Sequence, residues 1–575
     1  MSALVEVDGR SLNRSLHLHA DVVVVGSGPA GATAAWTMAS RGLSVIVLEE
    51  GHEATTADFP ESGLEAMARW YRELGMSVAL GPAIIPYLQG RAVGGTSVIN
   101  GAICWNLPRD VHEQWLRDDP GLGEKLPWSD VVRAETVVDE RLQVAPTDPR
   151  VAGAKNLLLG SGAEVLGLEH RAIRRNAPGC RGSGRCLQGC PNGAKASADR
   201  TFLADAVKLG AKVVSGVRVR KVVLERRRAV GVEAVTARGV RVDVSAKHAV
   251  VLAASAIQTP LLLRESGLTR GPVGDNLMAH PGVSVTGRFA EAVNNHLGAT
   301  QGHEVIGLRH EGLKVEALGF DVSILASRLP GTGASFMKSL ARLSHHAAWG
   351  AAIRAKARGS VRSVGGSTVV RYALTVDDVK TVRRGASVVA QLFVAAGAEA
   401  VAPGISGVAS ELNTMEQARA LETNAPLDAG AYSMSMTHLF GTARMGSDPA
   451  NSVVRPDFRH HDVDALFVAD SSVFPTNTGV NPMVSIMALA HLCGLRVASC
   501  SRRQELEWSS RDDDGFELRV RARAAFCFSR SESDPPAGVK LVQPWWPPIT
   551  RRGLSKTSAR RPRHHSVRSA SRRLR

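Results

Sequence analysis

A strand, a glycine-rich turn and a helix near the N-terminus constrain the fold of this chain more than any other feature. Residues 21–25 are Asp-Val-Val-Val-Val, a run apolar enough for a parallel strand that is buried on both faces. Three glycines follow at the spacing of a dinucleotide-binding turn. Gly26 permits the tight turn, Gly28 lets the backbone approach a pyrophosphate, and Gly31 lets the next helix pack closely against the strand.

The segments after this turn complete a dinucleotide-binding unit. A helix predicted from about Ala30 to Ser40, with Pro29 just before it, would direct its positive N-terminal end at the pyrophosphate. A second apolar strand, residues 45–48, precedes Glu49, whose carboxylate can bind ribose hydroxyls. The sequence therefore predicts an α/β fold with a bound dinucleotide, but this unit alone does not distinguish NAD from FAD.

The positive charge of the chain is concentrated at its C-terminal end. The formal net charge is +16, and residues 501–575 contain 18 Lys and Arg against 8 Asp and Glu. This segment is rich in Arg, Ser and Pro and lacks periodicity, so we predict a basic, disordered tail. Nucleic-acid binding through the tail is the less favoured interpretation, because the rest of the chain is only mildly basic.

The sequence shows no secretory signal and no apolar run of membrane-spanning length. We therefore expect a cytoplasmic protein without a transmembrane segment. Residues 335–357 are predicted to form a basic amphipathic helix; a solvated helix face is the favoured interpretation and peripheral membrane association the alternative. The scattered cysteines outside one cluster do not resemble a secreted disulfide framework.

The remaining patterns indicate a second structural unit. β-Branched runs over residues 213–244 predict an antiparallel meander, and residues 250–254 predict a short buried strand followed by a helix. Residues 283–426 alternate strand-like segments with helical ones, which is typical of an antiparallel sheet with flanking helices. A last strand at residues 466–470 and a helix at residues 481–498 complete the globular part.

Five segments, in order along residues 21–498, resemble the signature segments of the glucose–methanol–choline (GMC) oxidoreductases. The first is the dinucleotide-binding turn. The second, residues 90–101, is rich in glycine and small hydroxyl side chains, and the third, residues 255–268, departs from the family pattern only just beyond its end, where Thr269 replaces a usual glycine. The last two are residues 437–446, with His-x-x-Gly-Thr, and residues 467–486.

The resemblance implies a Rossmann-like FAD-binding domain interleaved with an antiparallel-sheet α+β substrate domain. We assign residues 1–282 and 427–500 to the FAD domain, with a cysteine-containing loop at 176–198, and residues 283–426 to the substrate domain. Residues 501–575 form the tail. The FAD contacts that the resemblance and the turn imply are Gly26, Gly28, Pro29, Ala30, Gly31, Glu49, Arg91, Val93, Gly94, Gly95, Thr96, Ser97, Asn100, Val219, Asp470, Pro482 and Met483.

The resemblance also implies a catalytic pair, His438 and Asn481, acting on the hydroxyl of an alcohol. A histidine titrates near neutrality, so His438 is predicted to accept the hydroxyl proton as hydride passes from the α-carbon to flavin N5. Asn481 can donate a hydrogen bond to the substrate oxygen without titrating. His280, which lies in another family-like segment, is predicted to be structural and near the FAD.

Three cysteines lie close together in the pattern C-x5-C-x3-C-P, at Cys180, Cys186 and Cys190. Three thiolates suit a 3Fe–4S cluster, and the spacing is similar to that in flavoprotein subunits of some sugar dehydrogenases of the family. Related segments also occur in long-chain-alcohol and sterol oxidases that need no cluster. We therefore favour a structural loop covering the FAD, with an iron–sulfur cluster as the alternative and zinc as the least favoured reading.

The sequence thus predicts an FAD-dependent oxidation of a small-molecule alcohol to a carbonyl. The electron acceptor stays open between oxygen, a quinone and a cytochrome. The few aromatic residues in the substrate domain lean towards an apolar alcohol. The alternatives are a flavoprotein subunit that relays electrons through an iron–sulfur centre, and a nucleic-acid-binding protein acting through the tail.

Overall fold

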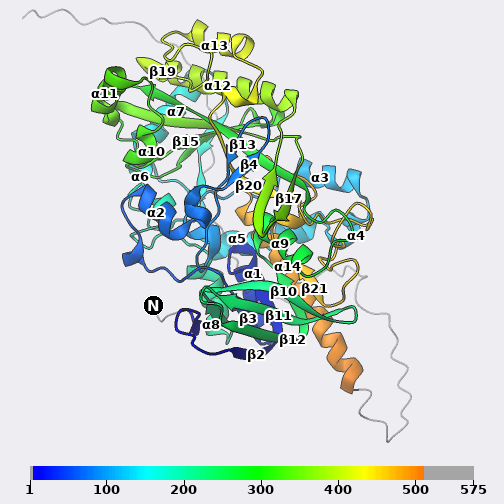
Figure 1. Cartoon of the computed structure of the whole chain (residues 1–575). Coiled ribbons are helices and arrows are strands. Elements are labelled where there is room, and N and C mark those ends of the chain that lie inside the picture. Colours follow the sequence, from blue (N-terminus) through cyan, green and yellow to red (C-terminus); the bar gives the residue numbers. More distant parts are fainter. Residues whose placement is uncertain (1–3, 510–575) are drawn as a thin grey trace, which may run out of the picture. The chain divides into compact units, whose positions relative to one another are not determined.

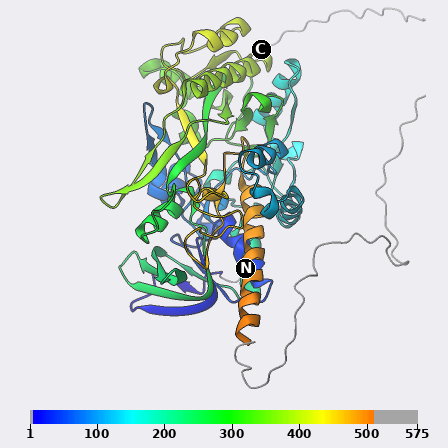
Figure 2. The ribbon, with the colours of Figure 1, turned by 90° about the vertical axis from the view of Figure 1, so that its right-hand side faces the viewer.

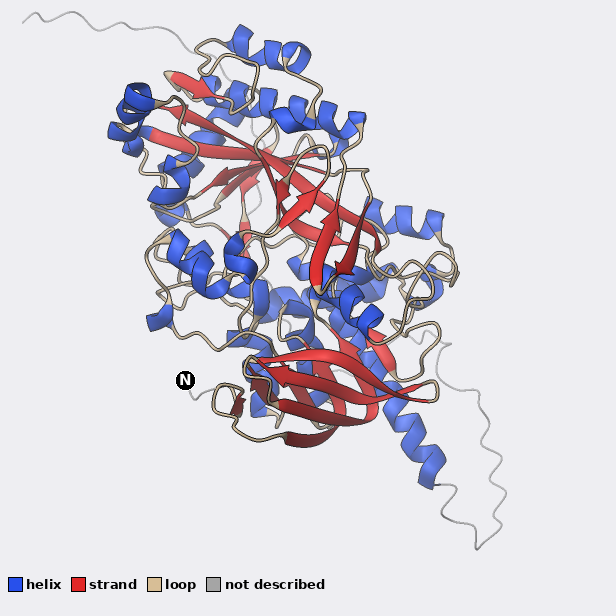
Figure 3. Cartoon of the chain, viewed as in Figure 1, coloured by secondary structure: helices blue, strands red, loops and turns tan. Residues whose placement is uncertain are grey.

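A computed structural model describes residues 4–509. Most strands of this part of the chain fall into two large sheets, and helices cover both (Figures 1 and 3). The predicted start of a disordered tail at residue 501 is wrong, because residues 501–509 are helical; from residue 510 onwards the predicted tail lies outside the described residues. This mixed architecture confirms the predicted fold class of a Rossmann-like domain combined with a second, largely antiparallel sheet.

The first sheet has the strand order β1-β9-β3-β2-β12-β11-β10, with β21 paired to β12. Its centre is parallel, and the four valines at residues 22–25 are almost fully buried there, as expected for a strand covered on both faces. The predicted meander is confirmed in β10 to β12, which pair antiparallel. The strands are β1 (Val7–Asp8), β2 (Leu16–Val25), β3 (Val45–Leu48), β9 (Lys212–Ser215), β10 (Val217–Glu225), β11 (Arg228–Thr236), β12 (Arg241–Leu252) and β21 (Leu466–Val468).

Helix α1 (Pro29–Ala39) follows the glycine turn and packs against helix α14 (Met483–Ser509), which also contacts α5 (Trp128–Arg141). Figure 2 shows α14 as one long helix running past the first sheet. Within it, residues 483–502 form the one described helical stretch that is long and apolar enough to cross a membrane, and 61% of its apolar window is buried. The burial agrees with a core helix, whose apolar side chains are covered by protein.

The second sheet has the order β5-β4-β18-β17-β13-β16-β15-β14-β7, and β19 and β20 also pair with β13. Its strands come from several parts of the chain, including β4, β5 and β7, which precede residue 283. Helix α12 (Val376–Ala395) packs on β16 and β13. The strands are β4 (Val78–Leu80), β5 (Ile85–Pro86), β7 (His170–Ala172), β13 (Asp275–Arg288), β14 (His303–Val305), β15 (Leu313–Leu318), β16 (His346–Ile353), β17 (Gly359–Val364), β18 (Ser367–Arg371), β19 (Ala400–Ala402) and β20 (Met434–Phe440).

The prediction of one helix over residues 335–357 is wrong. Helix α11 (Gly333–Ala341) ends early, and residues 346–353 form strand β16 in the middle of the second sheet. The alanines of this strand favour a helix by intrinsic propensity, and pairing with both β13 and β15 overrides that preference. No long amphipathic helix is therefore present here to lie on a membrane surface.

Candidate active site

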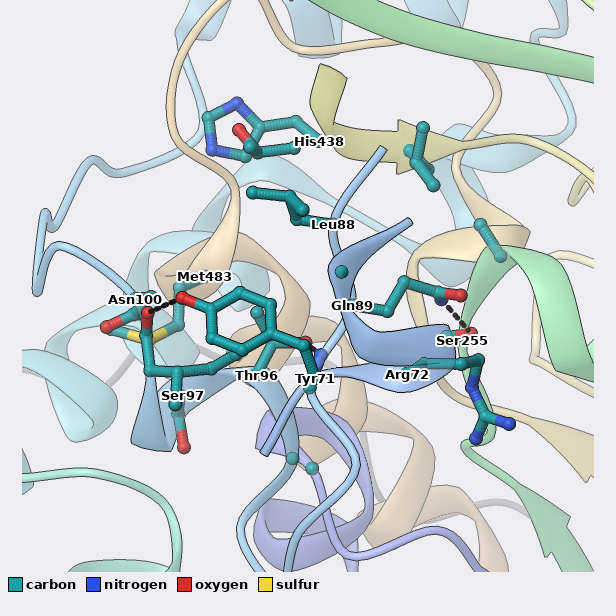
Figure 4. A pocket seen from close by; sticks show the side chains of 18 of the residues that line it. Tyr71, Arg72, Leu88, Gln89, Thr96, Ser97, Asn100, Ser255, His438 and Met483 are labelled. Atoms are coloured by element: carbon teal, nitrogen blue, oxygen red, sulfur yellow. Dashed lines mark hydrogen bonds between the residues drawn. The ribbon is translucent and has the colours of Figure 1, made fainter. Parts of the chain in front are cut away.

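A cavity of about 770 Å³ is lined by residues from the glycine turn, the residue 90–101 segment and the second sheet. Figure 4 shows His438 on one side of it and Thr96, Ser97, Asn100 and Met483 on the other. Of the predicted site residues, the cavity is lined by Gly26, Gly28, Pro29, Ala30, Glu49, Gly95, Thr96, Ser97, Asn100, Val219, His438, Asp470, Asn481, Pro482 and Met483. Residues more than 400 positions apart in the sequence are thus brought to one site.

The glycine turn provides the close approach that a pyrophosphate needs. A Cβ added to Gly31 would lie 1.8 Å from the carbonyl oxygen of Gly26, so Gly31 is required by the packing of the turn itself. Gly28 is different, because an added Cβ would meet nothing nearer than Gly95 Cα at 3.8 Å. The absence of a side chain at Gly28 therefore leaves space beside the start of α1, where an anionic group is stabilised by the helix N-terminus.

Glu49 at the end of β3 braces this turn as well as lining the cavity. One carboxylate oxygen accepts hydrogen bonds from the backbone N–H of Ser27 at 2.9 Å and from its hydroxyl at 2.7 Å, and the other accepts from the Gly51 N–H at 2.8 Å. Burial raises the pKa of Glu49. The neighbouring Glu50, which the sequence analysis did not select, also lines the cavity and pairs with Arg72 at 2.7 Å.

Asp470 connects the last strand of the first sheet to helix α9 (Ser255–Glu265). Its carboxylate accepts hydrogen bonds from the Ser255 N–H at 2.9 Å, from the Thr259 hydroxyl at 2.5 Å and from the Ser472 N–H at 2.8 Å. Burial raises its pKa. This set of bonds holds two of the sequence signature segments against each other at the wall of the cavity.

Four predicted cofactor contacts do not line the cavity: Gly31, Arg91, Val93 and Gly94. Arg91 is exposed, and Val93 belongs to the hydrophobic core. Gly94, with φ of +94°, donates its N–H to the Ser27 hydroxyl at 3.0 Å. Gly31 and Gly94 therefore shape the backbone around the cavity from behind its wall, where the sequence motif alone predicted direct contact.

His438 and Asn481 meet at the junction of the two sheets. His438 lies on β20, and Asn481 lies just before α14, so the Pro482 that follows it sets the direction of the helix. His438 Nε2 and Asn481 Nδ2 are 3.4 Å apart. On the other side, His438 Nδ1 lies 3.2 Å from Nδ1 of His280, which comes from β13. All three residues line the cavity.

The hydrogen bonds of His280 and His438 constrain which of their ring nitrogens carry hydrogen. Gly479 donates its N–H to Nε2 of His280 at 2.8 Å, so a neutral His280 carries its hydrogen on Nδ1 and donates it to His438. A neutral His438 then carries its own hydrogen on Nε2. Asn481 Nδ2 can only donate, so its contact with His438 Nε2 is a hydrogen bond only when Nε2 carries no hydrogen. The contacts of the pair with Gly479 and with Asn481 therefore favour opposite tautomers of His438.

Burial, reinforced by the positive charge of Lys314, lowers the pKa of His438 to about 3, below the usual value for a histidine. Burial also holds the pKa of His280 well below its usual value.

A buried ionic cluster that the sequence analysis missed supports Asn481. Lys314 on β15 donates to Asn481 Oδ1 at 2.7 Å and to Glu316 at 2.6 Å, and it lies 3.0 Å from Glu304. Burial disfavours the charge of Lys314, but the two carboxylates outweigh it and raise its pKa. Because the ammonium group only donates, the contact fixes the amide so that Nδ2 faces His438. No sequence motif identifies Lys314 as a site residue. The alternation of side chains between the two faces of β15 is the one sequence signal that could have placed it towards the interior.

The cysteine cluster does not form a metal site. In the described part of the chain, no group of three or more His, Cys, Asp or Glu side chains is arranged to hold a metal ion. The guanidinium of Arg175 takes the place expected for a cluster: its nitrogens lie 3.6 Å from Cys180 Sγ and 3.1 Å from Cys186 Sγ. The prediction of iron–sulfur ligation by Cys180, Cys186 and Cys190 is therefore unsupported.

The cysteine loop instead braces the wall of the cavity. Lys195 donates to the carbonyl oxygens of Asn100 and Cys186, both at 2.9 Å, and Tyr71 donates to that of Leu187 at 2.7 Å. Leu187 itself lines the cavity. These contacts agree with the structural loop that was the favoured interpretation.

Comparisons with known proteins identify the family. The N-terminal and C-terminal domains of GMC oxidoreductases match residues 20–282 and 355–490. An uncharacterized GMC-type oxidoreductase of Mycobacterium tuberculosis is 36% identical over 493 residues, which cover 85% of this chain and 77% of that protein. A long-chain-alcohol oxidase of Arabidopsis thaliana is 29% identical over 517 residues, covering 85% and 70%. The crystal structure of pyridoxine 4-oxidase from Mesorbium loti matches with a TM-score of 0.63 and 19% identity, over 83% of this chain and 98% of that one.

The fold, the cavity and the matching segments define a flavoprotein oxidoreductase, and the chain belongs to the GMC oxidoreductase family, whose members bind FAD. The residues present fit that cofactor, because the glycine cradle at Gly28, the helix N-terminus of α1 and the acidic end of β3 line one continuous cavity.

Proposed function

We propose that this protein oxidises an alcohol to the corresponding carbonyl compound, with FAD as the hydride acceptor. The pairing of His438 Nε2 with Asn481 Nδ2, 3.4 Å apart at the wall of the cavity, carries the proposal. Flavin supplies the two-electron chemistry when it is bound. The long-chain-alcohol oxidases among the relatives support an alcohol as the substrate class.

His438 and Asn481 hold the substrate oxygen. Asn481 Nδ2 donates to it and stabilises the negative charge that gathers there as the hydroxyl proton leaves for His438 Nε2. The two side chains also orient the carbon that bears the hydroxyl. They come from elements fixed by packing, β20 and the start of α14, so little reorganisation is needed when substrate binds.

His438 is also the proposed acceptor of the hydroxyl proton. For this, Nε2 must be free of hydrogen, which moves the hydrogen of His438 to Nδ1. His280 already accepts from Gly479 at Nε2, so this change costs the hydrogen bond between the two histidines. Proton uptake is therefore coupled to a rearrangement of the histidine pair, and His280 acts as a positioning residue.

Anaerobic flavin reduction tests the function. The purified holoprotein is mixed with a panel of primary and secondary alcohols without oxygen, and flavin absorbance is followed. Bleaching by at least one alcohol, with formation of the carbonyl product, is the expected result. Readmission of air then separates an oxidase, whose flavin reoxidises rapidly, from a dehydrogenase that needs a quinone or cytochrome acceptor. A flavin that no alcohol in the panel bleaches would overturn the proposal.

A further inference from the structure

The cavity contains a cation that the proposed oxidation does not use. Arg328 follows helix α10 (Val322–Ala326) and lines the cavity together with Ser284 of β13, whose hydroxyl accepts a hydrogen bond from the guanidinium. The Arg328 guanidinium also lies over the ring of Phe320, 5.5 Å from its centroid. Within residues 4–509, no carboxylate forms an ion pair with Arg328.

The cations around the cavity differ in whether they have an acidic partner. Arg72 is paired with Glu50 at 2.7 Å, whereas Arg218, which also lines the cavity, forms no ion pair among the described residues. Lys314 is neutralised by Glu304 and Glu316. Burial lowers the pKa of Arg328, and no neighbouring carboxylate raises it again. This agrees with a guanidinium that is partly removed from water and has no anion beside it. An arginine retains its charge in such surroundings, so an anion is the ligand it can bind.

Strand β13 carries one residue that contacts His438 and one that contacts this cation. It carries His280, which contacts His438, and four residues further along it carries Ser284, which contacts Arg328. At roughly 3.3 Å per residue, the two points lie about 13 Å apart along the strand. His280, Gly282, Val283 and Ser284 all line the cavity, so the space between the two points is continuous.

Part of the cavity wall is apolar and includes Val283, Leu318, Phe320, Ile324 and Met434, although Gln301, Glu316 and Thr437 also line the cavity. The apolar part favours burial of methylene groups over polar chains. The site therefore offers the pair His438 and Asn481 at one end, an apolar stretch of wall, and one guanidinium with a neighbouring hydroxyl at the other end.

We propose that the substrate is a hydroxy acid, in which an aliphatic chain separates the reacting hydroxyl from a carboxylate that binds Arg328. The planar guanidinium can bind a carboxylate through two parallel hydrogen bonds. The inference rests on the proposed alcohol oxidation and goes beyond it, because it assigns the end of the substrate that is not oxidised. It also modifies the expectation of a purely apolar alcohol.

The test compares terminal hydroxy acids of increasing chain length with neutral alcohols of equal length, in the wild type and in Arg328→Met. For each substrate we would measure the limiting rate of anaerobic flavin reduction and divide it by the substrate concentration that gives half of that rate. We expect the wild type to prefer hydroxy acids long enough to span the strand, and Arg328→Met to lose about tenfold to a hundredfold on these, because a hydrogen bond to a charged group is removed. Its rates with neutral alcohols should stay within about twofold.

A matched control is Arg371→Met, because Arg371 lies on β18 of the same sheet but is exposed and does not line the cavity. Wild-type behaviour of this variant with both substrate series is expected. A second measurement avoids turnover: a saturated fatty acid without a hydroxyl group should perturb the flavin spectrum of the wild type and not that of Arg328→Met.

The outcomes separate the two proposals. If no alcohol reduces the flavin, the proposed alcohol oxidation is wrong. The spectral measurement with the fatty acid then still tests whether Arg328 binds a carboxylate. If neutral alcohols reduce the flavin but hydroxy acids are no better, or if Arg328→Met loses equally on both series, the assignment of the carboxylate site is wrong.

Discussion

Lys314 Nζ lies 2.7 Å from Asn481 Oδ1, and this contact joins the second sheet to the proposed catalytic pair, His438 and Asn481. It determines which end of the Asn481 amide faces His438, because an ammonium group cannot accept a hydrogen bond. The lysine is itself held by Glu304 and Glu316. The direction of one donor in the active site is thus set by a buried ionic cluster on neighbouring strands.

Lys314→Met should retain FAD, but an alcohol should reduce its flavin about a hundredfold more slowly than that of the wild type. The reason is that the Asn481 amide is then free to turn its oxygen towards the substrate. The measurement is anaerobic flavin reduction by stopped flow. Glu304 keeps its ion pair with Arg171 in this variant, but Glu316 loses its cation, so Lys314→Met/Glu316→Gln serves as a second variant that relieves the buried charge. Lys356→Met, at an exposed lysine, is the control. Normal reduction rates in both Lys314 variants would show that the contact does not orient Asn481.

Substitutions at His438 separate its two proposed tasks. Glutamine can donate a hydrogen bond to the substrate oxygen but cannot accept a proton at neutral pH, whereas alanine can do neither. If proton acceptance dominates, both His438→Gln and His438→Ala should reduce the flavin about 10²- to 10⁴-fold more slowly than the wild type. A His438→Gln rate within about tenfold of wild type would assign the histidine to hydrogen-bond donation alone. FAD content, read from absorbance, should be unchanged in each.

Protonation of His438 should not change the rate of flavin reduction around neutral pH. Burial and Lys314 lower its pKa to about 3, so it is neutral from pH 5 to pH 9 and becomes protonated only on further acidification towards pH 3. The limiting reduction rate at saturating alcohol is the quantity to follow. A break near pH 6.5 that disappears in His438→Gln would contradict this assignment of the protonation state.

Two glycines of the same turn should respond differently to alanine. Gly31→Ala places a Cβ 1.8 Å from the Gly26 carbonyl oxygen and should lower the free energy of unfolding of the FAD-free protein by about 3 kcal/mol. Gly28→Ala meets only ordinary contacts and has φ of −63°, so its FAD-free stability should stay within about 1 kcal/mol of wild type. It should nevertheless fail to bind FAD, which titration of the apoprotein would detect. Full FAD affinity in Gly28→Ala would mean that the pyrophosphate does not approach this position.

The local parts of this architecture could be predicted from sequence, and the long-range parts could not. The turn at Gly26, the helix α1 and the meander follow from periodicity and glycine spacing, which act over short stretches. The segment that becomes β16 contains alanines, which favour a helix, and pairing with distant strands overrides that local preference. Lys314 and Arg328 belong to no motif, and their roles arise only when strands distant in sequence bring them to the cavity.

Strand β13 restricts how the active site can open. Met278, near its start, packs in the hydrophobic core of the first sheet, whereas Val285, further along, packs in that of the second. It is hydrogen-bonded to β20 across the stretch that bears His280. A hinge between the two halves would have to break this strand and its ladder of hydrogen bonds. Substrate entry must therefore depend on the segments bordering the cavity, such as the one around Arg328, and not on separation of the domains.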